Sequence, residues 1–146
     1  MLRGVPFEIS PKLLRILAEM GHGDRICIGD EYFAASTMAE RGRLVYSKGI
    51  GAVELIDAIL KLMPLDNWSD YSVVFMGKDD GNGGLESTPM TDRMTAKIRE
   101  YDENAADSAQ FVGRFEFYDL AKKCYAVIGS GETENYGCVI LQKGVK

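Results

Sequence analysis

The stretch LAEMGHGDRICIGD, residues 17–30, contains the end of a helix, a turn and the start of a strand, and it holds the only histidine of the chain. Upstream of it, apolar side chains recur at helical spacing, and Ser10-Pro11 is typical of an N-cap followed by proline at the first helical position. Gly21 fits the left-handed residue that ends a helix. The following segment RICIG, residues 25–29, predicts a short strand.

The rest of the chain continues this alternation of helical and β-rich segments. Helices are expected over residues 52–63, 90–103 and 117–124, strands over 71–77, 109–115, 125–131 and 138–144, and a loop over KDDGNGG at 78–84. Such alternation predicts a single three-layer α/β/α domain over residues 1–146, built around a mixed, mostly parallel sheet. The last two strands are joined by a short loop, and we expect them to pair antiparallel.

Composition argues against several classes of partner. The 146 residues carry a net charge of −5, whereas nucleic-acid binding needs clustered lysine and arginine, so nucleic acid is not an expected partner. No apolar run could span a bilayer, and the N-terminus lacks the apolar middle segment of a signal peptide, so we expect a cytoplasmic protein without a membrane partner. The 3 cysteines show neither metal-ligand nor CxxC spacing, so we expect reduced thiols and no bound metal.

His22 is the first candidate for chemistry. It lies between Gly21 and Gly23, which carry no side chains and would let a ligand come close. An imidazole gives or takes protons near neutral pH, and Asp24 or Asp30 could orient the ring. The alternative is that the two glycines only end the helix and that His22 is an ordinary surface or core residue.

Asp30 directly follows the strand expected at 25–29, and ligands of open α/β sheets bind beyond the carboxyl ends of the strands. Its carboxylate could accept hydrogen bonds from hydroxyl groups, or Asp30 could simply start a turn or cap a helix. In the segment GRFEFYDLAKK, Arg114 could donate two hydrogen bonds to neighbouring hydroxyls, and Tyr118 could donate or accept one.

Other aromatic residues give weaker signals. Phe115 and Phe117 could form an apolar wall for a sugar, but core packing is the favoured interpretation. Tyr136 precedes Gly137 and a strand, where a tyrosine can present its hydroxyl at a cleft. The chain has no GxGxxG fingerprint, no GxxxxGK[ST] phosphate loop and no GxSxG nucleophile elbow. The residues present favour proton transfer on a small polar substrate without a cofactor.

Three segments of the chain resemble a known family, and together the resemblance extends over almost the whole chain. They are ISPKLLRILAEMGHGDRICIGDEYF near the start, FYDLAKKCYAVIGSGE in the middle and YGCVILQKGV at the end. They are similar to the D-ribose pyranase / L-fucose mutarotase family, and RFEFYDLAKKCYAVI and GSGE resemble the L-fucose mutarotase branch. The resemblance implies an isomerase that interconverts the α and β anomers of a free monosaccharide by ring opening and reclosure, with neither metal nor cofactor.

The resemblance also implies roles for individual residues. His22 would be the proton donor of the GHGD motif. As the second group that transfers a proton, our own hypothesis is Tyr118, Tyr136 or an ordered water. The sugar would be held by Asp30, Arg114, Tyr136, Gly137 and Cys138. Members of the family form rings, usually a decamer of two pentamers with the site between neighbouring subunits, so we expect a homodecamer.

The chain departs from the family at identifiable positions. Cys138 replaces an asparagine, which would change affinity or sugar preference if that side-chain amide touches the sugar. Tyr32 and Ser36 stand where members often carry histidines, and the stretch 78–90 is longer than usual. Two alternatives therefore stay open, namely a D-ribose pyranase and a non-catalytic sugar-binding regulatory protein on the same scaffold.

Overall fold

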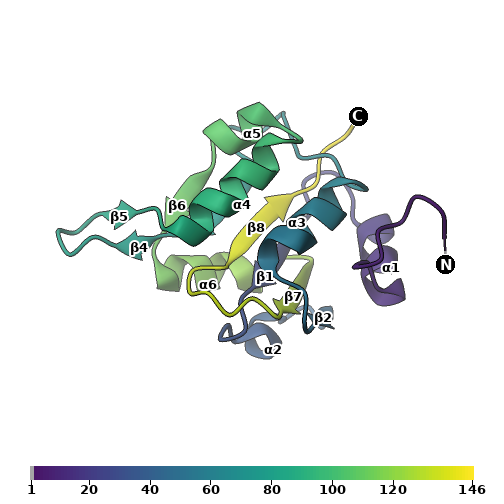
Figure 1. Ribbon diagram of the computed structural model, residues 1–146, viewed down its shortest axis with the longest axis horizontal. Helices are drawn as coiled ribbons and strands as arrows, with labels where there is room; N and C mark the ends of the chain where they lie inside the picture. The colour runs from purple at the N-terminus through teal and green to yellow at the C-terminus, as the bar shows by residue number, and fades with distance from the viewer. Residues whose placement is uncertain (1) are drawn as a thin grey trace.

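The computed structural model describes residues 2–146, in which short helices and strands alternate along the chain (Figure 1). The helices are α1 (Pro11–Glu19), α2 (Ala35–Met38), α3 (Ala52–Leu60), α4 (Pro89–Arg99), α5 (Glu103–Asp107) and α6 (Arg114–Lys122). The strands are β1 (Arg25–Gly29), β2 (Leu44–Ser47), β3 (Val73–Met76), β4 (Lys78–Asp79), β5 (Leu85–Glu86), β6 (Gln110–Val112), β7 (Ala126–Ser130) and β8 (Val139–Gln142).

The main sheet has six strands in the order β2-β7-β1-β8-β3-β6, and β4 and β5 form a separate hairpin. Strand β7 runs parallel to β1 and β2, and β3 runs parallel to β6, whereas β8 runs antiparallel to both of its neighbours. The predicted mixed, mostly parallel sheet is therefore confirmed. The predicted pairing of the last two strands is wrong, because both edges of β7 are occupied by β1 and β2. Every side chain of β8 is buried, as a central position requires.

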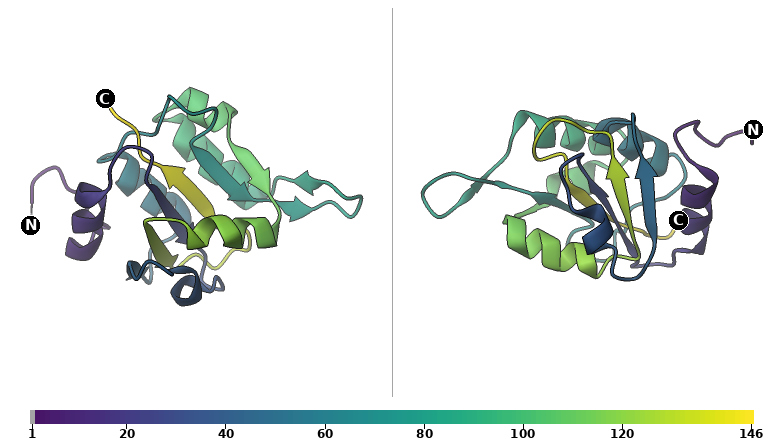
Figure 2. Two further views of the ribbon diagram at one scale, coloured as in Figure 1. Left: turned by 180° about the vertical axis from the view of Figure 1, so that it is seen from behind. Right: turned by 90° about the horizontal axis from the view of Figure 1, so that it is seen from below.

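Helices cover both faces of this sheet. Along β1, Ile26 and Ile28 belong to the larger core, which packs under α1, α3, α4 and α5, while Cys27 belongs to a second core under α2 and α6. This alternation follows from the pleat, which points successive side chains to opposite faces. Figure 2 shows α6 and α2 on the face away from α3 and α4. The predicted three-layer arrangement is confirmed.

The two ends of α1 differ in how well they were predicted. Ser10 is the N-cap and Pro11 begins the helix, as expected. At the other end, the ammonium group of Lys143 donates hydrogen bonds to two of the last carbonyl groups, at 2.8 and 2.6 Å. These carbonyls are therefore satisfied without a left-handed residue at Gly21, and the positive φ of 86° falls on Gly23 in the following turn.

Three further differences concern short elements. The sequence did not predict α2, β2 or α5, which have only four or five residues and so display too little periodicity. The predicted loop KDDGNGG is partly strand, because Lys78 and Asp79 pair with β5 in a hairpin that projects from the body of the molecule (Figure 1). The strand expected over 109–115 ends at Val112, since Gly113 is already the N-cap of α6.

Candidate functional site

A cavity of about 560 Å³ lies where β1, β3 and β6 end and β8 begins. Asp30 follows β1, Gly77 follows β3 and Cys138 precedes β8, and all three line the cavity. Because β8 is antiparallel to its neighbours, its first residues meet the carboxyl ends of the parallel strands, where open α/β sheets bind ligands. The volume lies within the range of small-molecule sites, about 300–1,000 Å³.

Most of the residues predicted to form the site meet in this cavity. The lining includes Asp30, Arg114, Tyr118, Tyr136 and Cys138. Gly137 lies next to it, between Tyr136 and Cys138, and its backbone N–H helps to lower the pKa of the Asp30 carboxyl group. His22 is not part of this group.

Asp30 is held by donors from two loops. Its Oδ1 accepts the backbone N–H of Tyr32 at 3.1 Å, and its Oδ2 accepts the S–H of Cys138 at 3.4 Å. Burial raises the pKa of the Asp30 carboxyl group, and the hydrogen bonds from Cys138 and the backbone N–H groups act in the opposite direction. Asp30 therefore forms the turn that the sequence suggested and also faces the cavity, so both interpretations of this residue apply.

The segment before β8 approaches Asp30 closely. Tyr136 has a φ of 68°, in the left-handed region that residues other than glycine seldom adopt. A Cβ atom on Gly137 would lie 2.6 Å from Cγ of Glu132 and 3.3 Å from Cβ of Asp30, so only glycine fits without a shift of its neighbours. Strained backbone of this kind is concentrated at functional sites.

Arg114 and Tyr118 form a pair on the first turns of α6. The Nε–H of Arg114 donates a hydrogen bond to the hydroxyl oxygen of Tyr118 at 2.8 Å, as the i, i+4 spacing allows. Within residues 2–146, the two terminal amino groups of Arg114 form no hydrogen bond with the protein. They are available to a ligand, and the O–H of Tyr118 is likewise available as a donor, because its oxygen serves as the acceptor for Arg114.

Aromatic and hairpin residues complete the cavity. Phe115 is 75% exposed and lines the cavity, so the prediction that it packs in the core is wrong, whereas Phe117 is fully buried as expected. Residues two apart on a helix point to different faces, which explains the contrast. Asp79 and Leu85 also line the cavity, from the β4–β5 hairpin. Neither was predicted, because Asp79 lies in the segment predicted as a loop and strands of two residues show no pattern.

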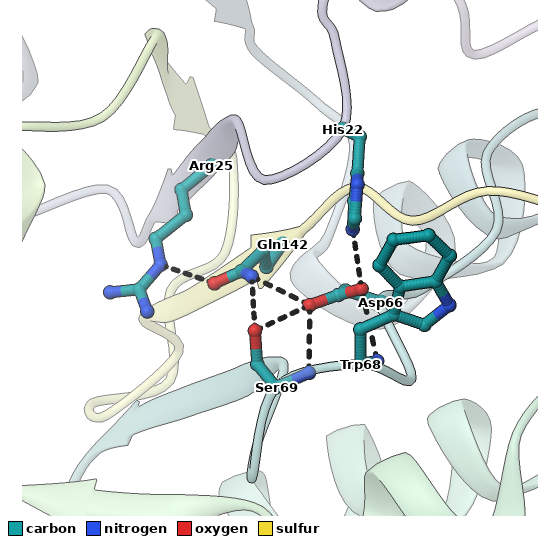
Figure 3. A network of polar contacts seen from close by, with 6 residues as sticks. All are labelled: His22, Arg25, Asp66, Trp68, Ser69 and Gln142. Carbon is teal, nitrogen blue, oxygen red and sulfur yellow. Dashed lines mark hydrogen bonds and ion pairs between the residues drawn. The ribbon is translucent and has the colours of Figure 1, made fainter.

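His22 lies at the other end of β1 from Asp30. Its Nε2 is 2.8 Å from Oδ1 of Asp66 (Figure 3). Neither of the two aspartates expected to orient the ring does so, since Asp24 accepts the backbone N–H of Gly21 at 2.8 Å and Asp30 faces the cavity. The whole length of β1 lies between His22 and Asp30, and His22 is not among the residues that line the cavity. Within one chain, the imidazole and the cavity are therefore separate.

Asp66 was not identified from the sequence. Its side chain is only 1% exposed, and hydrogen bonds from Ser69, from His22 and from backbone N–H groups hold the pKa of its carboxyl group well below the usual range. The only local signal is the turn segment DNWSD, in which an aspartate precedes polar residues that can bond to it. Its contact with His22 spans 44 residues and could not be read from that segment.

Residues 2–146 contain neither a cluster of metal ligands nor a membrane-spanning helix. No group of three or more His, Cys, Asp or Glu side chains is arranged to hold a metal ion there. In the same range, the helices are all too short or too polar to cross a membrane.

Comparison with known proteins gives matches over nearly the whole chain. Residues 5–146 match the model of a family described as the RbsD / FucU transport protein family. The curated fucose mutarotase of Homo sapiens is 40% identical over 147 residues, which cover 99% of this chain and 94% of that protein.

Solved structures give the same picture. FucU from Bifidobacterium longum superposes with a TM-score of 0.90 at 41% identity, covering 99% of both chains. The fucose mutarotase from Streptococcus pneumoniae, solved in complex with L-fucose, superposes with a TM-score of 0.85 at 36% identity, again over 99% of both chains. The likeness therefore includes both the cavity and the segment that carries His22.

Proposed function

Since this chain belongs to the RbsD / FucU transport protein family, we propose that it is an L-fucose mutarotase, an isomerase that interconverts the α and β anomers of the free sugar. The observation that carries this proposal is the match to proteins named fucose mutarotase over 99% of the chain. A cavity of about 560 Å³ that combines a carboxylate, a guanidinium group and tyrosine hydroxyls supports it, because a monosaccharide presents hydroxyl groups to such donors and acceptors.

Anomer exchange requires that the sugar ring open and close again. One group takes the proton of the anomeric hydroxyl, a second group protonates the ring oxygen, and the carbonyl turns before the ring recloses. Each such proton transfer by a positioned side chain contributes about 10²–10⁴-fold to the rate. In our proposal, Asp30 and Arg114 hold sugar hydroxyls, and Tyr118 or Tyr136 is one of the two proton-transfer groups.

The second proton-transfer group would be His22 of a neighbouring copy of the chain. The side chain of His22 is 34% exposed, and the adjacent Trp68 is 75% exposed. Near the cavity, Tyr32 and Phe115 are also largely exposed, at 68% and 75%. Exposed apolar side chains at both places favour contact between them, and head-to-tail contact of two different surfaces can close into a ring. This supports the expected ring assembly.

Nuclear magnetic resonance tests the activity directly. Saturation of the anomeric proton of α-L-fucose should transfer to the β anomer much faster in the presence of the protein than in buffer. D-Ribose serves as the comparison substrate and should show the smaller acceleration. Binding of L-fucose without faster exchange would instead support a non-catalytic sugar-binding protein, and faster exchange of ribose than of fucose would support a pyranase.

Mixing of variants tests whether two copies share a site. His22→Ala and Arg114→Ala chains should each be inactive alone, and unfolding and refolding them together should restore activity. In a random mixture, about a quarter of the interfaces would combine an intact imidazole with an intact cavity. Each variant carried alone through the same treatment is the control, and a mixture as inactive as its components would contradict a shared site.

The size of the assembly and the cellular location remain predictions. Ten copies of the 16.1 kDa chain would give a mass of about 161 kDa by light scattering, whereas a smaller mass would contradict the decamer. Fractionation of cells with an antibody against the chain tests the expected cytoplasmic location.

A further inference from the structure

The imidazole of His22 contacts a buried carboxylate from a distant segment of the chain. His22 lies in the turn between α1 and β1, and Asp66 lies between α3 and β3. The side chain of His22 is 34% exposed, whereas that of Asp66 is 1% exposed. Figure 3 shows the carboxylate between the ring on one side and several polar groups on the other.

These polar groups are hydrogen-bond donors to Asp66. The carboxylate accepts the backbone N–H of Trp68 and of Ser69, each at 3.2 Å, the Ser69 hydroxyl at 2.6 Å and the Gln142 amide at 2.9 Å. The Ser69 oxygen itself accepts from Gln142 at 3.0 Å, so the Ser69 hydrogen is directed to Asp66. Arg25 donates to Oε1 of Gln142 at 2.8 Å, which keeps the NH₂ group of the amide turned toward Asp66. This set of donors stabilises the ionised carboxylate.

The ionised carboxylate determines which nitrogen of His22 carries the hydrogen. A carboxylate can only accept hydrogen bonds, so Nε2, at 2.8 Å from Oδ1, must be the protonated nitrogen. In the neutral ring the lone pair then lies on Nδ1, which has no hydrogen-bond partner in the described part of the chain. Trp68 packs edge-on against the imidazole, with ring centroids 4.8 Å apart at 86°, and this contact limits rotation of the ring.

We propose that Asp66 is a positioning residue for His22: it holds the imidazole in the Nε2–H tautomer and leaves Nδ1 as the nitrogen that exchanges protons with the sugar. The inference rests on the proposed mutarotase function. As the ring opens, Nδ1 takes the proton of the anomeric hydroxyl, the bond between C1 and the ring oxygen breaks, and the ring oxygen takes a proton from a tyrosine of the cavity. On reclosure the tyrosine regains its proton, and Nδ1 returns its own to the new anomeric hydroxyl. Asp66 stays ionised throughout and stabilises the imidazolium.

The tautomer can be measured in the unmodified protein. Because the chain has only 1 histidine, a long-range ¹H–¹⁵N spectrum contains the signals of one imidazole. Once the pH has been raised until the imidazole signals no longer change, so that the ring is neutral, Nε2 should give the shift of a protonated nitrogen and Nδ1 that of an unprotonated one. A protonated Nδ1, or equal averaged shifts for the two nitrogens, would overturn the inference without the need for any variant.

Substitution of Asp66 tests the consequence for catalysis. In Asp66→Asn, the side-chain amide can donate to Nε2 and so favour the opposite tautomer, and in a Ser-His-Asp triad such a change costs about 10⁴-fold in kcat. Mutarotation needs less assistance, so we expect kcat for L-fucose to fall about 10- to 100-fold while KM changes less than about twofold. Asp70→Asn, on the same loop but without a hydrogen bond or ion pair within residues 2–146, is the matched control and should leave kcat and the tautomer unchanged.

The outcomes separate this inference from the proposed function. If the wild-type protein does not accelerate the exchange of fucose anomers, the proposed function is wrong, while the tautomer of His22 can still be measured. If Asp66→Asn binds L-fucose and keeps the wild-type kcat and tautomer, the positioning role of Asp66 is wrong, while the proposed mutarotase function is unaffected. Should Asp66→Asn not fold, Ser69→Ala removes one donor to Asp66 and should lower kcat by a smaller factor at unchanged KM; an unchanged kcat in that variant would count against the inference.

Discussion

Replacing Arg114 by lysine tests how the cavity holds the hydroxyl groups of the sugar. The Nε–H of Arg114 is bonded to Tyr118, which fixes the plane of the guanidinium group and leaves its two terminal amino groups for the ligand. Lysine keeps the positive charge but has no planar fork, so one of two hydrogen bonds to neighbouring hydroxyls should be lost.

The expected magnitude follows from that lost bond. A hydrogen bond to a charged group contributes about 1.5–3 kcal/mol. Because about 1.4 kcal/mol corresponds to a tenfold change, kcat/KM for L-fucose should fall about 10- to 150-fold, mainly through KM. Arg114 is exposed on the surface of α6, so the free energy of unfolding should change by less than about 0.5 kcal/mol.

Anomer exchange measured by magnetisation transfer over a range of fucose concentrations provides kcat and KM, and urea unfolding provides the stability. Arg99→Lys is the control, because Arg99 lies at the end of α4, pairs with Asp107 and is not among the cavity residues. The reasoning is refuted if Arg114→Lys retains kcat/KM within about twofold of the wild type while remaining folded.

Three further predictions concern the stability and reactivity of the fold. Gly137→Ala should lower the free energy of unfolding by about 1–3 kcal/mol, because the new Cβ would lie 2.6 Å from Cγ of Glu132. Gly21→Ala is the control in urea unfolding, because the nearest contact of its new Cβ would be Oδ2 of Asp24 at 3.7 Å; equal stabilities of the two variants would contradict the prediction. The pKa of Asp66 is lower in the folded than in the unfolded chain, so its contribution to stability is present above about pH 4 and is lost as the pH falls further. The free energy of unfolding of Asp66→Asn, measured between about pH 5 and pH 2, should therefore depend less on pH than that of the wild type. The same pH dependence in both proteins would contradict this prediction. Burial raises the pKa of all 3 cysteine thiols, and a protonated, buried thiol reacts slowly. Ellman's reagent should therefore modify none of them within minutes in the native protein and all of them in denaturant. A fast-reacting thiol in the native protein would contradict this prediction and show that part of the core opens readily.

Local features of the fold were predictable because their signals lie within a few residues. Ser10 and the proline after it predicted the start of α1, and the segment at 25–29 predicted a short strand, which the structure shows to be buried on both faces. Helical and strand periodicity arise from backbone geometry, so they appear in any sufficiently long segment. Elements of four or five residues, such as β2 and α5, were missed because they contain too few positions to show a period.

The residues of the candidate site also divide into those that the sequence predicted and those that it did not. Asp30, Arg114, Tyr118 and Tyr136 could be named from the sequence because each has the chemistry to bind a hydroxyl and lies at the edge of a predicted element. The resemblance to a known family added Cys138, which lines the same cavity. For Phe115 the sequence offered both a ligand wall and core packing, and the favoured choice of core packing was wrong, since aromatic residues are more often part of the core.

The sequence by itself determined the alternation of helices and strands, the three-layer architecture and the chemical types of the candidate residues, because these depend on local geometry and on the side chains themselves. Only the tertiary structure decided that β8 inserts between β1 and β3, that Asp66 rather than Asp24 or Asp30 binds His22, and that His22 lies far from the cavity of its own chain. These are contacts between segments many residues apart, such as the 44 that separate His22 from Asp66. They are selected by the packing of the whole chain, in which buried polar groups must find partners, and no local pattern records that choice.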